Sequence, residues 1–174
     1  MGAMITVREE RSEDVPAVRA IHRAAFPGDA EARIVDLLRA RGKALISLVA
    51  GTPDGATVGH ILFSPVTLDA PARRLEGAGL APLAVLPSHQ GRGIGSELVR
   101  MGLAACRTRS IPFIVVLGDP RYYGRFGFGT ASAHNLASEY GAGPEFMVQD
   151  LIPGSLPTAG GLVRYAPEFA ELGV

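Results

Sequence analysis

The chain has 174 residues, a length that suits one domain with a full hydrophobic core. Its 17 basic and 17 acidic residues give no net charge, and this disfavours nucleic acid as a partner because nucleic-acid-binding proteins usually carry a basic excess. Cys106 is the only cysteine, which excludes an internal disulfide and fits a reducing, cytoplasmic compartment. No apolar run is long enough to cross a bilayer, and no signal-peptide core is present, so we expect no membrane partner.

We expect a single domain over residues 1–174, in which residues 1–3 are a cloning remnant or an upstream start ahead of Met4. A short strand is predicted at 5–8. A helix then starts at Ser12, because capping and acidic side chains come first and Pro16 is still close to the helix start. Pro27 and Gly28 end this helix, and a second helix follows over 30–41. Strands over 44–50 and 57–68 flank a hairpin turn at 52–55.

The second half of the chain predicts shorter elements. We expect a loop over 71–79, a central strand over 82–86 and a helix that runs to Arg109. The residues from Pro112 to Leu117 are apolar on consecutive positions, as in a strand covered on both faces. A short helix carries Tyr122 and Tyr123, a loop covers 131–144, and two strands lie at about 145–151 and 162–165. The chain therefore predicts about seven strands.

A glycine-rich turn joins the central strand to the helix after it, with the sequence Gln90-Gly91-Arg92-Gly93-Ile94-Gly95-Ser96. The first N–H groups of a helix lack partners and carry partial positive charge, so such a turn is an anion site that suits phosphate. A Walker A loop is set aside, because Gly95 is not followed by Gly-Lys-Ser/Thr. A dinucleotide fingerprint starting at Gly91 stays an alternative, although Ser96 holds its third glycine position.

A third interpretation rests on a resemblance. Gln90-x-x-Gly93-x-Gly95, after Pro-Leu-Ala-Val-Leu-Pro, is similar to the acetyl-CoA motif of the GNAT N-acetyltransferase superfamily. The segment Tyr122-Tyr123-Gly124-Arg125-Phe126-Gly127-Phe128 resembles a later Tyr-x-x-x-Gly-Phe element of that family. The wording of 59–66 and 160–165 also resembles the YhbS-like branch, so the likeness covers nearly the whole chain.

The resemblance implies an α/β fold of three layers. Its sheet is mixed and mostly antiparallel, flanked by helices, and its central parallel pair of strands splays apart. The implied enzyme is a monomer or homodimer that transfers acetyl from acetyl-CoA directly to a primary amine in a ternary complex. The amine belongs to a small molecule or a peptide, and no metal is needed.

The resemblance also implies roles for individual residues. Backbone groups of Leu83, Ala84 and Val85 would contact the acyl-pantetheine arm. The turn residues would hold the pyrophosphate: Gln90, Gly91, Arg92, Gly93, Ile94, Gly95 and Ser96. Tyr123 matches the family position that donates to the departing thiolate, and Tyr122 takes this role if the register differs by one residue. Glu31 lies in a segment that borders the acceptor pocket.

The base that would deprotonate the amine is not identified by sequence. The family often places an acid on the central strand or its neighbour, and 80–85 contains none. His60, Glu31, Glu76 and His134 are candidates. His60 lies among apolar residues, so it is either a packed, hydrogen-bonded histidine or a substrate-pocket base. The missing base keeps a second function open, a non-catalytic acyl-CoA sensor. An NAD(P)-binding oxidoreductase is a third.

Overall fold

The computed structural model describes residues 4–141 and 143–174, so the expected remnant at 1–3 lies outside the described residues. The chain divides into two compact units. Unit 1 holds the residues up to Phe63, Ala81–Ala105 and Pro167–Val174. Unit 2 holds Ser64–Leu80 and Cys106–Ala166. Two strands and a helix, β3 (Thr57–Asp69), β4 (Arg74–Val85) and α3 (Ile94–Thr108), each contribute residues to both units.

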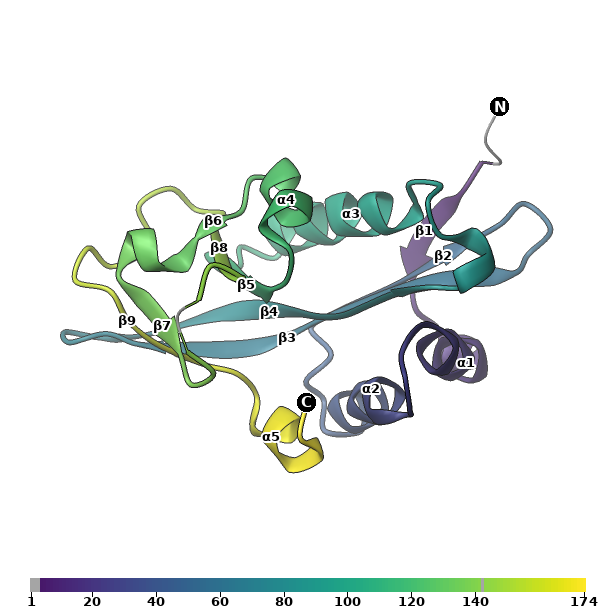
Figure 1. Ribbon diagram of the computed structural model, residues 1–174, viewed down its shortest axis with the longest axis horizontal. Coiled ribbons are helices and arrows are strands. Elements are labelled where there is room, and N and C mark those ends of the chain that lie inside the picture. Colours follow the sequence, from purple (N-terminus) through teal and green to yellow (C-terminus); the bar gives the residue numbers. More distant parts are fainter. Residues whose placement is uncertain (1–3, 142) are drawn as a thin grey trace. The chain divides into compact units, whose positions relative to one another are not determined.

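The fold is mixed α/β, with a nine-stranded sheet in which the hydrogen-bonded order is β1-β2-β3-β4-β5-β8-β6 and β9 pairs with both β3 and β7. In unit 1, β1 (Thr6–Glu9) and β2 (Ile46–Gly51) form an antiparallel meander with the first half of β3. The helices α1 (Val15–Ala25) and α2 (Ala30–Ala40) cover one face of these strands, and α3 covers the other (Figure 1).

The buried face of each helix in unit 1 follows the apolar period. Val18 and Ile21 of α1 and Ile34 and Leu38 of α2 are at most 1% exposed. Helix α3 buries Ile94, Leu98, Val99, Leu103 and Cys106. Met101 of the same helix is 42% exposed, because the helix turns its Val99 and Leu103 sides to the core.

Unit 2 is built around β5 (Phe113–Leu117), whose first four residues are at most 1% exposed. It pairs antiparallel with β8 (Phe146–Asp150) and parallel with β4. The pairs recorded between β4 and β5 are Ala78↔Ile114 and Gly79↔Val115, and β4 continues to Val85 beyond the last of these pairs. This is the arrangement expected of a central parallel pair that separates.

Three short elements lie where none was predicted. The strand β7 (Leu136–Ser138) interrupts the expected loop over 131–144 and pairs parallel with β9 (Gly161–Arg164). The two-residue strand β6 (Gly129–Thr130) pairs with β8, which raises the expected seven strands to nine. Helix α5 (Pro167–Leu172) packs within unit 1 near the C-terminus.

The expected loop over 71–79 is wrong from Arg74 onward, because β4 starts there. Its glycines look like turn residues in the sequence, but they make room for aromatic rings. A Cβ built on Gly77 would lie 2.6 Å from the Phe113 ring, and one built on Gly79 would lie 2.9 Å from the Tyr165 ring. Glycine inside a strand often marks such a close approach.

Candidate active site

The glycine-rich turn lies between β4 and α3 in unit 1. A short 3-10 turn at Pro87–His89 follows the strand, and α3 begins at Ile94. Gly91 and Gly93 have φ angles of 75° and 82°, and residues with a Cβ rarely adopt this backbone conformation. Nothing lies within 4 Å of where their Cβ atoms would be, so the glycines are required by backbone conformation and the turn is open.

The turn presents main-chain donors to solvent. Gly91, Arg92 and Gly93 are exposed, and Ser96 is half-buried. The N–H groups of the first helical turn have no acceptor within the helix, and the 15-residue α3 adds its dipole at the same end. These features suit an anion, and the anion site at this turn stays a prediction.

The side chain of Gln90 joins the turn to the strand before it. Its side-chain Nε2 donates to the carbonyl of Val85 at 3.0 Å, which ties the turn to the last residue of β4. Along this strand Leu83 and Val85 are half-exposed, whereas Ala84 is 3% exposed. The Gln90 side chain therefore braces the turn against the strand.

Tyr122 and Tyr123 end the short helix α4 (Pro120–Tyr123) of unit 2. Its N-cap is Asp119, whose carboxylate accepts the Arg121 N–H at 2.9 Å. The Tyr123 ring covers Gly118, where no Cβ would fit, and packs edge-on against Phe128 with ring centroids 5.8 Å apart. Burial, with a smaller contribution from Tyr122, raises the pKa of Tyr123 to about 12.

A phenol with so high a pKa keeps its proton at neutral pH. Tyr123 can therefore donate a hydrogen bond, but it cannot act as a base. Tyr122 has another environment, because the Arg125 guanidinium carbon lies 4.8 Å from the centre of its ring. The two tyrosines lie side by side with their rings at 89°, and only Tyr123 covers Gly118.

Glu31 lies in the first turn of α2, in unit 1. Its Oε2 atom is buried and finds no hydrogen-bond partner among the described residues. An unpaired buried carboxylate oxygen is costly and favours a cationic or hydrogen-bonding ligand. Glu31 therefore has the chemistry of an ammonium-binding residue.

His60 is 0% exposed on β3. Its Nδ1 lies 2.8 Å from His22 Nε2, and its Nε2 lies 2.8 Å from Ser47 Oγ. This is the geometry of the packed, hydrogen-bonded alternative. The other base candidates, Glu76 on β4 and His134 in unit 2, are exposed.

Sequence reasoning missed the partners of His60. Its neighbour His22 lies in the last turn of α1 and is 1% exposed. A signal was available, because His22 follows Ile21 on the apolar face of that helix, where a polar residue is unusual.

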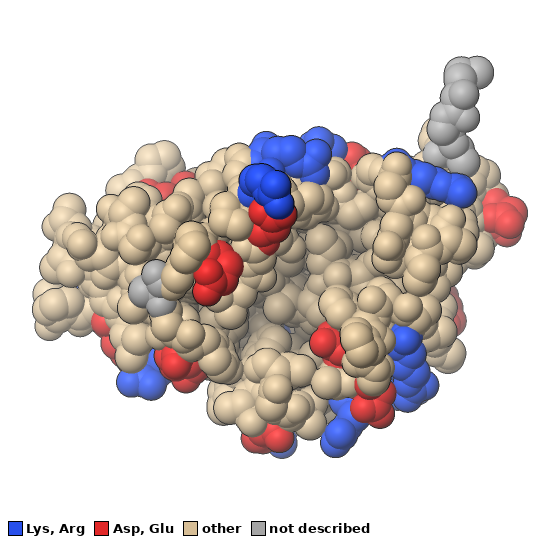
Figure 2. Space-filling view, viewed as in Figure 1, with Lys and Arg blue, Asp and Glu red and all other residues tan. Residues whose placement is uncertain are grey.

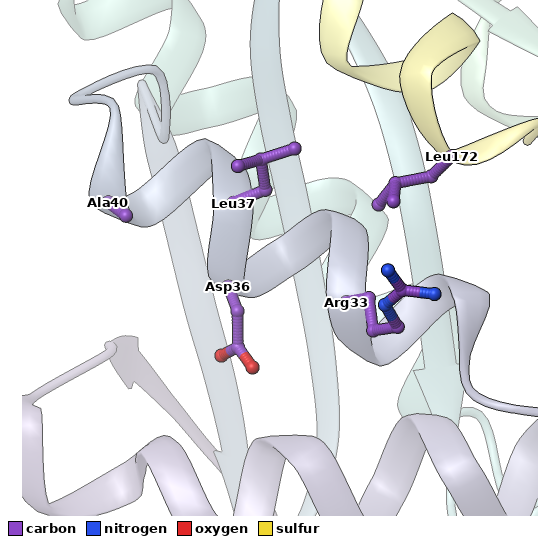
Figure 3. A pocket seen from close by; sticks show the side chains of 5 residues that line it. All are labelled: Arg33, Asp36, Leu37, Ala40 and Leu172. Carbon is purple, nitrogen blue, oxygen red and sulfur yellow. The ribbon is translucent and has the colours of Figure 1, made fainter.

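A cavity of about 360 Å³ opens between α2 and α5 in unit 1. Its lining residues are Arg33, Asp36, Leu37, Ala40 and Leu172 (Figure 3). The Asp36 carboxylate points away from Leu172, and it accepts hydrogen bonds from Arg19 and Arg39. This cavity contains none of the turn, strand or tyrosine residues predicted for the acetyl-CoA site.

Three further observations concern surface charge, metal binding and membrane spans. Figure 2 shows acidic and basic side chains in small groups on the face drawn, separated by uncharged residues. Within residues 4–141 and 143–174, no three His, Cys, Asp or Glu side chains gather in a way that would hold a metal ion. In the same part of the chain, no helix is both long and apolar enough to span a membrane.

Comparisons with known proteins identify the family of the chain. A family model described as an acetyltransferase (GNAT) domain matches residues 6–131. The uncharacterized N-acetyltransferase YhbS of Escherichia coli K12 is 37% identical over 164 residues, which cover 94% of this chain and 97% of that protein.

Two solved structures are similar over almost the whole chain. The crystal structure of Escherichia coli YhbS in complex with CoA matches with a TM-score of 0.89 and 36% identity, covering 98% of this chain and 94% of that one. A GNAT acetyltransferase of Brucella melitensis in complex with acetyl-CoA has a TM-score of 0.78 and 35% identity, with 97% and 99% covered. The chain therefore belongs to the GNAT family of acetyltransferases.

Proposed function

We propose that this protein transfers the acetyl group of acetyl-CoA directly to a primary amine, in a ternary complex and without a covalent enzyme intermediate. The observation that carries this proposal is the open turn before α3, in which Gly91 and Gly93 are exposed and have positive φ. The related structures with CoA and acetyl-CoA support the same cofactor. The family match over 6–131 includes parts of both units and supports one GNAT domain.

The turn residues bind the diphosphate of the cofactor. Main-chain N–H groups from Gly91 to Ser96 donate to its oxygens, and Arg92 adds a charge-assisted contact. Ile94 and Gly95 belong to the first turn of α3, whose N–H groups point out of the helix. Gln90 acts through its bond to Val85, which holds the turn in place.

The acyl end is bound by the last residues of β4. Leu83, Ala84 and Val85 lie beyond the last recorded pair with β5, so their main-chain groups suit a pantetheine arm that adds alongside the strand. A strand N–H that donates to the thioester carbonyl stabilises the negative charge that develops on its oxygen.

The reaction forms one bond and breaks another. The neutral amine nitrogen attacks the carbonyl carbon, the C–N bond forms, and the C–S bond breaks as CoA leaves as a thiolate. The nitrogen loses a proton to water, and the thiolate gains a hydrogen bond from the Tyr123 hydroxyl. Since a free thiol has a pKa of about 8.5, well below the pKa of about 12 at Tyr123, the phenol stabilises the thiolate by donating a hydrogen bond and keeps its proton.

Glu31 supplies the acceptor side of the site. An arriving amine is mostly an ammonium at neutral pH, because its pKa is about 10.4. Glu31 as a whole is only half-buried, and its carboxylate, whose Oε2 finds no partner among the described residues, suits that charge. His60 has no exposed atom to offer a substrate, so the role proposed for it is indirect and is developed below.

The proposal is tested with two matched glycine variants, Gly93→Ala and Gly55→Ala. Both residues have a positive φ, 82° and 90°, with nothing within 4 Å of a Cβ, so each substitution costs about 1–2 kcal/mol of backbone strain. Gly55 lies in the hairpin turn before β3 and is not among the residues proposed to bind the cofactor.

Acetyl-CoA at about 100 times its dissociation constant should stabilise the wild type and Gly55→Ala by about 2.7 kcal/mol in thermal unfolding. Gly93→Ala should lose most of this gain, and NAD should stabilise none of the three. A wild-type protein that acetyl-CoA does not stabilise would contradict the proposal.

A second function is kept because 80–85 carries no acid and His60 is buried. A non-catalytic acyl-CoA-binding module would show the thermal shift but release no thiol. A panel of primary amines, assayed for free CoA thiol, separates the two functions. Thiol release that depends on one amine supports the transferase.

A further inference from the structure

Four polar side chains of unit 1 form a continuous chain, which we call the buried relay: Glu10, Ser47, His60 and His22. The two histidines are buried, and Glu10 and Ser47 are half-buried. Glu10 follows the last residue of β1, and the others come from β2, β3 and α1. Ser47 Oγ donates to Glu10 Oε2, and the contacts of Ser47 with His60 and of His60 with His22 are each 2.8 Å. The relay thus links three adjacent strands to the last turn of α1.

The hydrogen bonds fix where the relay protons lie. The single Ser47 hydrogen goes to Glu10, so Ser47 Oγ must accept from His60 Nε2–H. His60 Nδ1 then carries a lone pair and accepts from His22 Nε2–H. The Nδ1 of His22 is left as a lone pair, and this atom is buried without a partner among the described residues.

An additional proton has no satisfactory place in the His22–His60 pair. On His22 Nδ1 it would create a buried N–H donor without an acceptor. On His60 Nδ1 it would face the Nε2–H of His22 across 2.8 Å, so that two donors would meet. If His22 changed tautomer to accept this proton at Nε2, its own hydrogen would move to Nδ1 and become the unpaired donor. Every arrangement leaves one donor unpaired, and this is costly in a buried site.

The surroundings of the pair also disfavour a proton on either histidine. Burial, with smaller contributions from His60 and Arg39, lowers the pKa of His22 to about 3, although Glu10 and Asp36 act in the opposite direction. Burial, with a smaller contribution from Arg39, also lowers the pKa of His60, whereas Glu10 and Asp14 raise it. Burial raises the pKa of Glu10, but its interactions with His60, Ser47 and Arg39 outweigh burial and lower this pKa to about 2.

The pair also holds the segment that follows it. His22 stacks on Phe26, with ring planes at 7° and centroids 6.1 Å apart, and Phe26 caps the C-terminal end of α1. The turn over 27–29 leads from there into α2, where Glu31 occupies the first turn. Arg39 of α2 donates to Glu10, so the relay contacts both helices.

We propose that the His22–His60 pair is a positioning device for the acceptor side, holding the α1–α2 turn and Glu31 in place while neutral and loosening them when it takes up a proton. This inference rests on the proposed function only for the role of Glu31 as an ammonium-binding residue. The pair itself acts on the fold whether or not a substrate is bound.

The first test is hydrogen exchange of residues 22–31 in the substrate-free protein, corrected for the intrinsic pH dependence of exchange. In the closed state the pKa of His22 is about 3, and in an open state it has the ordinary value of 6.5. As the pH falls from 7.5 to 5.5, the open state therefore takes up most of one proton and the closed state takes up almost none. Opening of the segment should therefore increase about tenfold between pH 7.5 and 5.5. His22→Gln keeps a donor at the Nε2 position and cannot be protonated, so it should reduce this increase.

His134→Gln is the matched control, because His134 is an exposed histidine of unit 2 and should leave the increase unchanged. Equal increases in the wild type and in His22→Gln would overturn the proposal. If His22→Gln does not fold, ¹⁵N shifts of the wild-type imidazoles decide the matter. In the closed state at pH 5.5 both His22 and His60 should be neutral with the proton on Nε2, and a charged ring or an Nδ1–H tautomer in that state would overturn it.

The second test measures KM for the amine and for acetyl-CoA from pH 7.5 to 5.5. The ratio of amine KM values, wild type over His22→Gln, should rise on acidification, while the same ratio for acetyl-CoA stays constant. A constant amine ratio would overturn the link to the acceptor side. Failure of acetyl-CoA to bind would instead contradict the proposed function and leave the exchange result standing.

Discussion

The two tyrosines of the short helix α4 have different surroundings. Tyr122 and Tyr123 are neighbours, yet only Tyr123 lies over a glycine, Gly118, and packs on Phe128. Its raised pKa comes mainly from burial, which disfavours the phenolate. A hydroxyl that stays protonated suits a hydrogen bond to a departing thiolate better than it suits a base.

Tyr123→Phe should lower kcat by about 10- to 100-fold, since a hydrogen bond to a charged group is worth about 1.5–3 kcal/mol. The ring is kept, so the contacts with Gly118 and Phe128 and the thermal stability should change little. Steady-state kinetics on an accepted amine provide the measurement. Tyr122→Phe is the control and should retain kcat, and equal losses in the two variants would remove Tyr123 from the proposed role.

Individual site residues differed in how well the sequence predicted them. The glycines at 91 and 93 were predicted because a positive φ is a local backbone demand that leaves a mark in the sequence. The buried relay was not predicted, because a pair such as His22 and His60 is brought together by the packing of α1 on β3 and lies 38 residues apart. Only the position of His22 on an apolar helix face hinted at it.

At the scale of elements, α5 is joined to the rest of unit 1 by charge. Glu168 is 1% exposed and accepts from Lys43 Nζ at 3.0 Å and from Arg41 Nη1 at 3.2 Å. Burial opposes the charge of Glu168, but the hydrogen bonds from Lys43 and Arg41 outweigh it, so its pKa lies below the usual value. The turn after α2 therefore fixes the C-terminal helix.

Glu168→Gln should destabilise the protein by about 1–2 kcal/mol, because it weakens two charge-assisted hydrogen bonds at a buried carboxylate. Urea unfolding at pH 7 measures this. The matched control is Glu171→Gln, since Glu171 also contacts Arg41 but its side chain is 48% exposed, and exposed pairs contribute less than about 1 kcal/mol. A loss for Glu171→Gln as large as that for Glu168→Gln would contradict this account of α5.

At the scale of the whole chain, long and strongly patterned elements were predictable and short ones were not. The helices predicted from Ser12 and over 30–41 and the strand predicted at 112–117 were confirmed as α1, α2 and β5, because their apolar patterns are local. The start of α1 differs, since Ser12–Asp14 form a 3-10 turn ahead of it. The strands β6 and β7, of two and three residues, are too short to show a period and exist through pairing with β8 and β9. The start of β4 was hidden by Gly77 and Gly79, whose role depends on rings distant in sequence.

The central claim is that main-chain N–H groups of the turn from Gly91 to Ser96 bind the diphosphate of CoA. Amide ¹H–¹⁵N spectra, recorded with CoA and with pantetheine, which lacks the diphosphate, test it most directly. We expect CoA to shift the Gly91–Ser96 amides strongly and pantetheine to leave them unchanged. Saturation with CoA without a shift at these amides, or equal shifts with pantetheine, would contradict the claim.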